Sequence, residues 1–427
     1  MKKYYYKDLN KEELGNLTKR PAIDTGKVSG IVKPILDDIK TRGSDAVLEY
    51  AKKFDGFESG SLRVSEEEFI EAGNKLDDKI KRAIETAAFN IETFHLKQKP
   101  SSYEVETVPG VKCSREYRPI ENVGLYVPGG SAVLPSTMLM LGIPAKIAGC
   151  LRAVVCSPAK NGKINFPLLY AARICGIKEF YKIGGAQAIG LMSYGLPSVP
   201  KVDKIFGPGN QYVTAAKLLV SIDAGGCAID MPAGPSEVMV IADENADPSF
   251  VASDLLSQAE HGTDSQAVLV CSSESNSNNI LTELEAQIKL LPRKDFASKA
   301  IKNSFVLIVD TVEQAVEFGN EYAPEHLILN VKDPEKLKSA VVNAGSVFLG
   351  PYSPESAGDY ASGTNHSLPT YGYAKAFGGI TVESFMKTVT FQQLTEEGLK
   401  NISEAVQTLA EAEGLTAHKN AISVRLK

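Results

Sequence analysis

A predicted helix that ends near Gln258 and His261 carries the first side chains whose types and spacing could do chemistry. Asp247 can cap the start of this helix and Pro248 suits its first turn. Asp254, Gln258 and His261 then fall on one face, because residues three or four apart are neighbours on a helix. An amide oxygen and an imidazole that point the same way form half of a metal site. An ordinary solvated helix end is the alternative.

Histidine is scarce in this chain, so the positions of its five histidines are informative. His95 lies at the edge of an apolar helical face and is predicted to be structural. The other four lie in short polar or Gly/Pro-containing segments, where functional residues concentrate. They are His261, His326, His366 and His418.

Glu325 and His326 form an adjacent carboxylate–imidazole pair just before a predicted strand. Pro324 disfavours helix at the preceding residue, so the pair is expected at an extended corner. The two groups can supply two separate acid–base functions, and a neutral imidazole suits base catalysis near pH 7. A solvated Glu–His pair is the alternative.

Two further segments could complete a metal site. The stretch 353–366 is predicted to be a polar loop and offers Asp359 and His366 as ligands or proton handlers. Glu413 and His418 lie near the end of the C-terminal helices, where a surface role is the alternative. Two histidines, an aspartate and Gln258 could form a zinc shell, although glutamine is an uncommon zinc ligand. The absence of a thiolate would favour a catalytic, exchangeable site over a structural one.

Three glycine-rich loops follow predicted strands, at 127–131, 183–187 and 206–211. Glycine lets the backbone approach a phosphate, and ligands of doubly wound sheets bind at the carboxyl ends of strands. None of the loops matches G-x-G-x-x-G, so a dinucleotide site and ordinary tight turns both stay open. A fourth loop, at 230–237, could place Ser236 at a ligand or connect two domains.

The elements around these residues alternate between strand and helix, which predicts an α/β protein with parallel sheets. Nine strand candidates are many for one sheet, so we expect two similar doubly wound units. Residues 1–100 are predicted to be helical, 103–118 to form a hairpin that turns at Pro109-Gly110, and 378–427 to be a mostly helical module. The strand candidates are 123–127, 153–156, 179–183, 204–206, 238–241, 267–271, 305–309, 327–330 and 347–349.

Composition excludes several classes of function. The 427 residues have a net charge of −6 and no long basic block, which argues against a nucleic-acid partner. No run of apolar residues is long enough for a membrane span, and the first residues lack the apolar core of a signal peptide, so a cytoplasmic protein is expected. The six cysteines form no CxxC pair and are predicted to be small buried hydrophobes.

Taken together, the motifs resemble those of the histidinol dehydrogenases. The resemblance covers nearly the whole chain, with no departure at the active positions. It rests on seven motifs in the family's order: GLYVPGG at 124–130, GGAQ at 184–187, KIFGPGN at 204–210, DMPAGPS at 230–236, LSQAEHG at 256–262, APEH at 323–326 and LTAH at 415–418.

This resemblance implies a zinc- and NAD-dependent oxidation of L-histidinol to L-histidine, with one zinc ion per subunit. It implies Glu325 and His326 as catalytic residues. The implied zinc ligands, which also contact substrate, are Gln258, His261, Asp359 and His418. Further implied substrate contacts are Ser236, His326, His366 and Glu413, and implied NAD contacts are Tyr126, Gln187 and Asn210.

The resemblance also implies a homodimer with shared active sites. We predict two Rossmann-like doubly wound units with an N-terminal helical region and a small C-terminal helical module. The first α/β domain is expected over 1–125 and 236–377, the NAD-binding domain over 126–235, and a module that reaches the partner subunit over 378–427.

Other classes of function remain to be weighed. A zinc hydrolase could use Glu325 to activate water without NAD, but it would leave the three glycine loops unexplained. A non-enzymatic metal or nucleotide binder would not need Glu325 and His326. A thiol mechanism would depend on Cys113 or Cys150, the two cysteines nearest the candidate loops.

Overall fold

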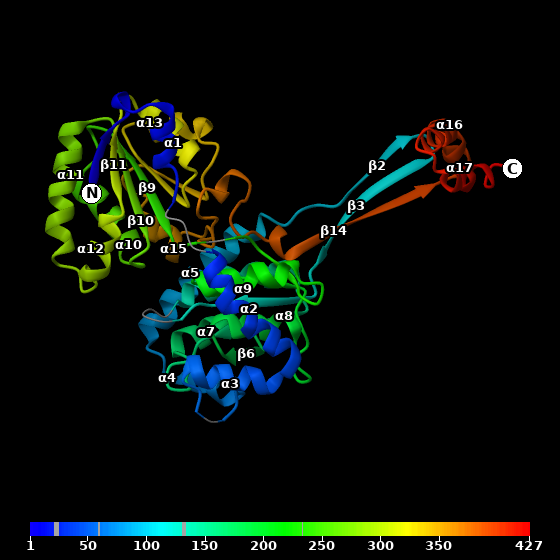
Figure 1. The fold of residues 1–427 in the computed structure, drawn as a ribbon, viewed down its shortest axis with the longest axis horizontal. Coiled ribbons are helices and arrows are strands. Elements are labelled where there is room, and N and C mark those ends of the chain that lie inside the picture. The colour runs from blue at the N-terminus through cyan, green and yellow to red at the C-terminus, as the bar shows by residue number, and fades with distance from the viewer. Residues whose placement is uncertain (21–24, 59, 130–133, 233) are drawn as a thin grey trace.

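The computed structural model describes residues 1–20, 25–58, 60–129, 134–232 and 234–427. Two α/β units lie side by side, and a long three-stranded arm projects away from them (Figure 1). Each unit is built on its own parallel sheet. The predicted α/β class with two doubly wound units is confirmed.

The first sheet has six parallel strands in the order β1-β11-β10-β9-β12-β13. Strands β9 and β10 are buried along their whole length, as expected of strands covered by helices on both faces. The strands are β1 Lys2–Tyr5, β9 Glu237–Ala242, β10 Gln266–Cys271, β11 Phe305–Ile308, β12 His326–Asn330 and β13 Ser346–Leu349. The helices of this unit are α1 Lys11–Leu17, α10 Pro248–Ala259, α11 Glu274–Ile288, α12 Lys294–Lys302, α13 Val312–Tyr322, α14 Pro334–Leu337 and α15 Glu355–Tyr360.

The second sheet repeats this topology with five parallel strands in the order β6-β5-β4-β7-β8. In both sheets the chain adds two strands on one side of a central strand, β4 or β9, and then crosses to the other side, and β1 is an additional edge strand of the first sheet. The switch points therefore lie beside β4 and β9. The strands are β4 Asn122–Tyr126, β5 Arg152–Ser157, β6 Glu179–Lys182, β7 Lys204–Phe206 and β8 Ala228–Ile229. The crossover helices are α6 Pro135–Ala148, α7 Phe166–Ile174, α8 Gly185–Tyr194 and α9 Gln211–Ile222.

Four N-terminal helices pack against the crossover helices α6–α9 of the second unit. Their buried residues belong to the two apolar cores that surround β4 and β5. The predicted boundaries place residues 1–125 with the first unit, whereas the apolar faces of these helices find their partners in the second. The remaining boundaries stay predictions. The helices are α2 Thr25–Arg42, α3 Ser44–Asp55, α4 Glu66–Lys75 and α5 Asp78–Leu96.

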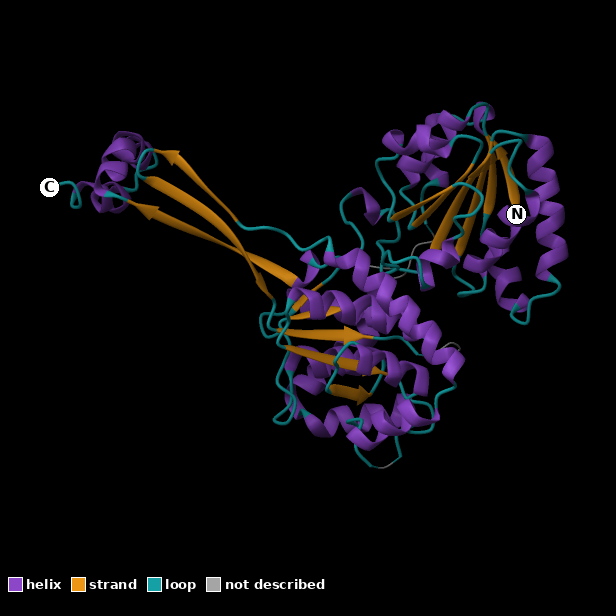
Figure 2. Cartoon of the chain, turned by 180° about the vertical axis from the view of Figure 1, so that it is seen from behind, coloured by secondary structure: helices purple, strands orange, loops and turns teal. Residues whose placement is uncertain are grey.

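The arm is an antiparallel sheet in the order β14-β3-β2 that carries two helices at its tip (Figure 2). The predicted hairpin is confirmed as β2 Tyr103–Val108 and β3 Val111–Pro119. The mostly helical prediction for 378–427 missed β14 Met386–Leu394, which pairs with β3 over its full length. Helices α16 Glu396–Ala412 and α17 Thr416–Ser423 follow it.

Three other details differ from or refine the sequence-based expectation. The described residues of 1–100 are mostly helical, as expected, but they begin with β1, a short edge strand. Residues 355–360, expected as loop, form α15. All nine strand candidates are strands in the structure. No helix within the described parts of the chain has the length and apolar character needed to cross a bilayer.

Candidate active site

A cavity of about 820 Å³ brings most of the predicted site residues together. From the first unit it is lined by residues before or at the start of β9 and β12, and from the second unit by residues that follow β4 and β7. The predicted site residues among its lining are Ser236, Gln258, His261, Glu325, His326, Asp359, His366 and Asn210.

The two units present opposite ends of their strands to this cavity. The second unit presents carboxyl ends beside its switch point, as expected for a doubly wound sheet. The first unit presents amino ends, because Ser236 precedes β9 and His326 begins β12. The position of Glu325 and His326 just before a strand, expected from the sequence, is confirmed, because His326 is the first residue of β12.

Helix α10 positions Gln258 and His261 as predicted. Asp247 caps the helix by accepting a hydrogen bond from the backbone N–H of Ser249. Gln258 is fully buried, and neither its amide oxygen nor its amide nitrogen has a hydrogen-bond partner. A buried amide without partners is costly, so Gln258 has the properties expected of a group awaiting a ligand.

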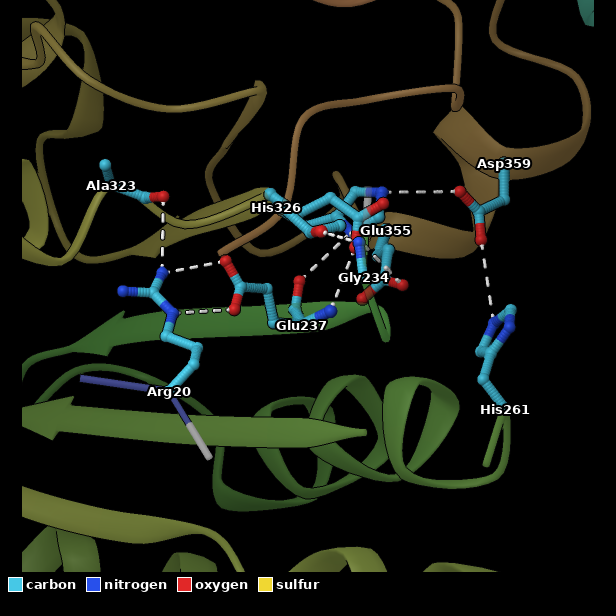
Figure 3. A network of polar contacts seen from close by, with 10 residues as sticks. Arg20, Gly234, Glu237, His261, Ala323, His326, Glu355 and Asp359 are labelled. Atoms are coloured by element: carbon cyan, nitrogen blue, oxygen red, sulfur yellow. Dashed lines mark hydrogen bonds and ion pairs between the residues drawn. The ribbon is translucent and has the colours of Figure 1, made fainter. Parts of the chain in front are cut away.

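Helix α15 brings carboxylates to the same place. Asp359 Oδ2 lies 3.9 Å from His261 Nε2, and Asp359 Oδ1 lies 3.6 Å from His326 Nε2 (Figure 3). Glu355, one helical turn earlier, joins His261 and Asp359 in a group whose ligand atoms lie within 4.8 Å of one another. Sequence reasoning missed Glu355, although its i,i+4 spacing from Asp359 would have indicated it had the segment been predicted as helix.

Glu325 and His326 are both held by the backbone of Glu237, the first residue of β9. The N–H of Glu237 donates to Glu325 Oε2 at 2.9 Å, and the carbonyl of Glu237 lies 3.3 Å from His326 Nδ1. Because a carbonyl only accepts, Nδ1 carries the proton in this contact. His326 Nε2 is left without a hydrogen-bond partner. The geometry therefore leaves Nε2 as the nitrogen that can take up a proton.

Burial and mutual charge shift the pKa values of this cluster. Burial raises the pKa of Glu325 to about 8, against the opposing effect of His326. Burial alone would lower the pKa of His326, but the carboxylates of Glu355, Glu325 and Asp359 outweigh it and raise that pKa to about 10. Without a bound cation, these carboxylates therefore favour the protonated, imidazolium form of His326, whereas the sequence predicts a neutral imidazole that acts as a base.

His366 is fixed between the two units. Its Nδ1 donates to the backbone carbonyl of Asp359 at 2.8 Å. Its Nε2 therefore accepts from the hydroxyl of Thr137 on α6, at 3.2 Å. Burial lowers the pKa of His366, which favours this neutral form. Thr137 carried no signal in the sequence.

The three predicted NAD contacts lie on the second unit, but only Asn210 lines the cavity. Asn210 caps α9 by accepting from the N–H groups of Tyr212 and Val213. The hydroxyl of Tyr126 accepts from the N–H of Gly185 at 3.1 Å, and the Gln187 amide donates to Asp55 at 2.9 Å. Tyr126, at the end of β4, thus contacts the start of α8, the helix that carries Gln187. Residues 130 and 131 of the first glycine loop lie outside the described residues, as does residue 233 of the fourth loop.

Glu413 and His418 lie apart from the cavity in this chain. Both are exposed at the tip of the arm, on α16–α17 (Figure 1). The two cysteines considered for a thiol mechanism are not among the described residues that line the cavity. Burial also raises the pKa of Cys150 to about 12, which disfavours the reactive thiolate.

Asp254 on α10 gives a prediction about stability. Burial raises the pKa of its carboxyl to about 7, above the unfolded value of 3.8. Folding then takes up a proton between about pH 4 and pH 7, so this group favours the folded state at low pH and loses that contribution as the pH rises. In metal-depleted protein, D254N is expected to raise the free energy of unfolding by about 1–4 kcal/mol at about pH 8 and by little at about pH 4. Urea unfolding at both pH values checks this, and an equal effect at both would contradict the assignment.

Comparison with known proteins identifies the family of this chain. The family model described as Histidinol dehydrogenase matches residues 18–426. The histidinol dehydrogenase of Photobacterium profundum is 50% identical over 428 residues, covering 100% of this chain and 96% of the relative. A chloroplastic histidinol dehydrogenase of Arabidopsis thaliana is 52% identical over 429 residues, covering 100% and 92%. The crystal structure of histidinol dehydrogenase from Elizabethkingia anophelis is 50% identical with a TM-score of 0.96, covering 100% of this chain and 98% of that one. The chain therefore belongs to the histidinol dehydrogenase family.

Proposed function

We propose that this protein oxidises L-histidinol through L-histidinal to L-histidine, the last step of L-histidine biosynthesis, with NAD as oxidant and zinc at the site. The observation that carries the proposal is one cavity that joins a buried Glu325–His326 pair to the ligand-type side chains of α10 and α15. The oxidation needs both an acid–base pair and a binding site for a nitrogen-rich substrate.

The donor set fits zinc. His261 offers a nitrogen and Asp359 an oxygen, and these ligand atoms lie within 4.8 Å of each other. Gln258 offers a buried amide oxygen without a hydrogen-bond partner. We assign these three as ligands, together with His418 of the partner subunit. The surrounding carboxylates would favour a cation, and a cation at Asp359 would oppose the effect that raises the pKa of His326.

The second unit fits a dinucleotide. The loop after β7 needs glycine, because a Cβ on Gly207, which has φ +116°, would lie 2.1 Å from the carbonyl oxygen of Tyr126. The amino end of α9 follows this loop, and such an end favours an anion. We assign Tyr126, Gln187 and Asn210 as the NAD contacts. Tyr126 ends β4 and Asn210 follows β7, the two strands that flank the switch point, and Gln187 lies at the start of α8, which contacts Tyr126 through Gly185.

The chemistry of the site divides between two side chains. When bound, zinc would anchor nitrogens of the substrate, and NAD would accept a hydride in each of the two oxidations. His326 Nε2 accepts the hydroxyl proton as the alcohol is oxidised, while Nδ1 stays bonded to Glu237. Glu325 then accepts a proton from the water that adds to the aldehyde, and His326 returns its proton to the aldehyde oxygen. In the second oxidation His326 Nε2 again accepts a hydroxyl proton, now that of the hydrate. Ser236 and His366 line the cavity and are assigned to substrate contacts.

We also propose a homodimer with shared sites. The arm holds Glu413 and His418 far from the cavity of its own chain (Figure 1). A ligand on such an extension can act only at the site of another copy. Glu413 is assigned to a substrate contact there. A cytoplasmic location is part of the same proposal.

Metal depletion tests the zinc assignment. Chelation followed by removal of the chelator should abolish NADH formation from L-histidinol, and added Zn²⁺ should restore it. Zinc bound per subunit should fall and recover together with activity. Full activity in protein shown to be free of metal would contradict the assignment.

A further inference from the structure

An ion pair buried beside the cavity connects the start of the chain to the catalytic pair. Arg20 Nε and Nη2 each donate to the Glu237 carboxylate at 2.8 Å, although the two residues are 217 positions apart. Their side chains are only 5% and 1% exposed. Figure 3 shows this bidentate pair beneath the corner that carries His326. Arg20 and Glu237 are not among the described residues that line the cavity.

Arg20 also contacts the corner that precedes Glu325. Its guanidinium lies 3.4 Å from the centre of the Tyr322 ring, and Nη2 lies 3.4 Å from the carbonyl oxygen of Ala323. Ala323 has a φ of +52°, a left-handed conformation that is unfavourable for alanine. Arg20 therefore contacts Glu237, whose backbone is hydrogen-bonded to Glu325 and His326. It also contacts the strained turn at Ala323, which precedes these two residues.

Glu237 transmits this constraint through its backbone. The Glu237 N–H donates a hydrogen bond to Glu325, and the Glu237 carbonyl accepts one from His326 Nδ1. The Glu237 carboxylate is hydrogen-bonded to Arg20. The N–H and the carbonyl belong to the peptide groups on either side of the Glu237 Cα, so a displacement of this Cα would move both contacts. Because the Glu237 side chain is fixed by two hydrogen bonds, Arg20 limits that displacement.

We propose that Arg20, through Glu237, is a positioning residue that holds the Glu325 carboxylate in the orientation needed to deprotonate water during aldehyde oxidation. The inference rests on the proposed function. A buried ion pair is weak evidence for a role in stability, since such pairs can often be replaced by apolar groups without loss. Its position against the catalytic backbone contacts is what favours a role in orientation.

The Arg152–Glu179 pair offers a matched control in the second sheet. Arg152 also binds its glutamate in bidentate fashion, at 2.7 and 2.8 Å, and also donates to a backbone carbonyl, that of Pro200. This pair joins the starts of β5 and β6 and is not among the described residues that line the cavity. R20M and R152M therefore remove the same type of interaction, once beside the site and once away from it.

The test measures kcat and KM with L-histidinal and NAD in zinc-loaded protein. R20M is expected to lower kcat about 10–100-fold, as misplacement of a catalytic group can do, with KM changed less than about twofold. R152M should leave both constants unchanged. In a Glu325→Gln background, R20M should cause little further loss, because the group that it positions has lost its basicity. R20K, which keeps one charged donor, should recover part of kcat.

Two results would overturn the inference: an unchanged kcat in folded R20M, or an equal loss in the wild-type and Glu325→Gln backgrounds. If R20M does not fold, R20M/E237Q decides the question in the same way, because it leaves no buried carboxylate unpaired. A wild-type protein that oxidises neither L-histidinol nor L-histidinal would instead refute the proposed function.

Discussion

Replacing His326 by Asn is expected to lower kcat for both oxidations by about 10²–10⁴-fold, the usual contribution of a general base. His326 is 4% exposed, and its Nε2 is a free nitrogen within the cavity. Asparagine can still donate to the Glu237 carbonyl, so the change removes the proton acceptor while keeping the contact that orients it. Single-turnover NADH formation from L-histidinol and, separately, from L-histidinal measures the two steps.

Glu325→Gln provides the contrast within the same pair. Its expected effect is confined mainly to aldehyde oxidation, because Glu325 is assigned to water activation and His326 to the alcohol proton. Glutamine can still accept the Glu237 N–H, so packing is preserved. Normal oxidation of L-histidinal by this variant would show that the division of roles is wrong. Zinc content measured in both variants excludes loss of the metal as the cause.

Mixing two inactive variants is expected to restore activity if the site is shared between subunits. H261N removes a proposed zinc ligand from the body of its own chain, and H418N removes a proposed ligand from the arm that, in the proposed dimer, serves the other chain. In a heterodimer of the two, one site lacks both groups and the other is intact. Random exchange gives about half heterodimers with one intact site each, so about a quarter of wild-type activity should return.

A second mixture serves as the control. H261N and D359N both alter the body side of the site, so their heterodimer contains no intact site and should stay inactive. H418N that is fully active alone, or a mixture of H261N and H418N that forms heterodimers without activity, would contradict the shared site. Native mass spectrometry of the mixtures establishes that subunits have exchanged.

Much of the fold could be predicted from the sequence because the strands of both units are short, apolar runs separated by helical patterns. Strands such as β9 and β10 are buried on both faces and therefore show continuous apolar sequence. Strand β14 was missed because it lies in the arm, where residues such as Val389 and Phe391 are exposed in the single chain. Without a buried face it shows no pattern of burial, and its partner β3 lies far away in the sequence.

The site could be predicted in part for a similar reason. Side chains with unusual chemistry, such as the Glu325–His326 pair, are visible in the sequence, and the family's motifs gave their assignments. Glu355 was missed because its helix was predicted to be a loop. Arg20 and Glu237 are 217 positions apart, and no local pattern in the sequence indicates their contact. The amino ends of the first sheet's strands face the cavity because of the way in which the two units pack together. The hydrophobic periodicity of the sequence carries no information about that packing.

The yield of NADH per molecule of L-histidinol tests the central claim most directly. Oxidation of an alcohol to a carboxylate removes four electrons, so two NADH should form for each L-histidinol consumed, with L-histidine as the product. The measurement uses zinc-loaded, folded protein with limiting L-histidinol and excess NAD, and product analysis accompanies the NADH absorbance. Two NADH with L-histidine is the result that the account predicts. No NADH, or one NADH with L-histidinal accumulating, would contradict it.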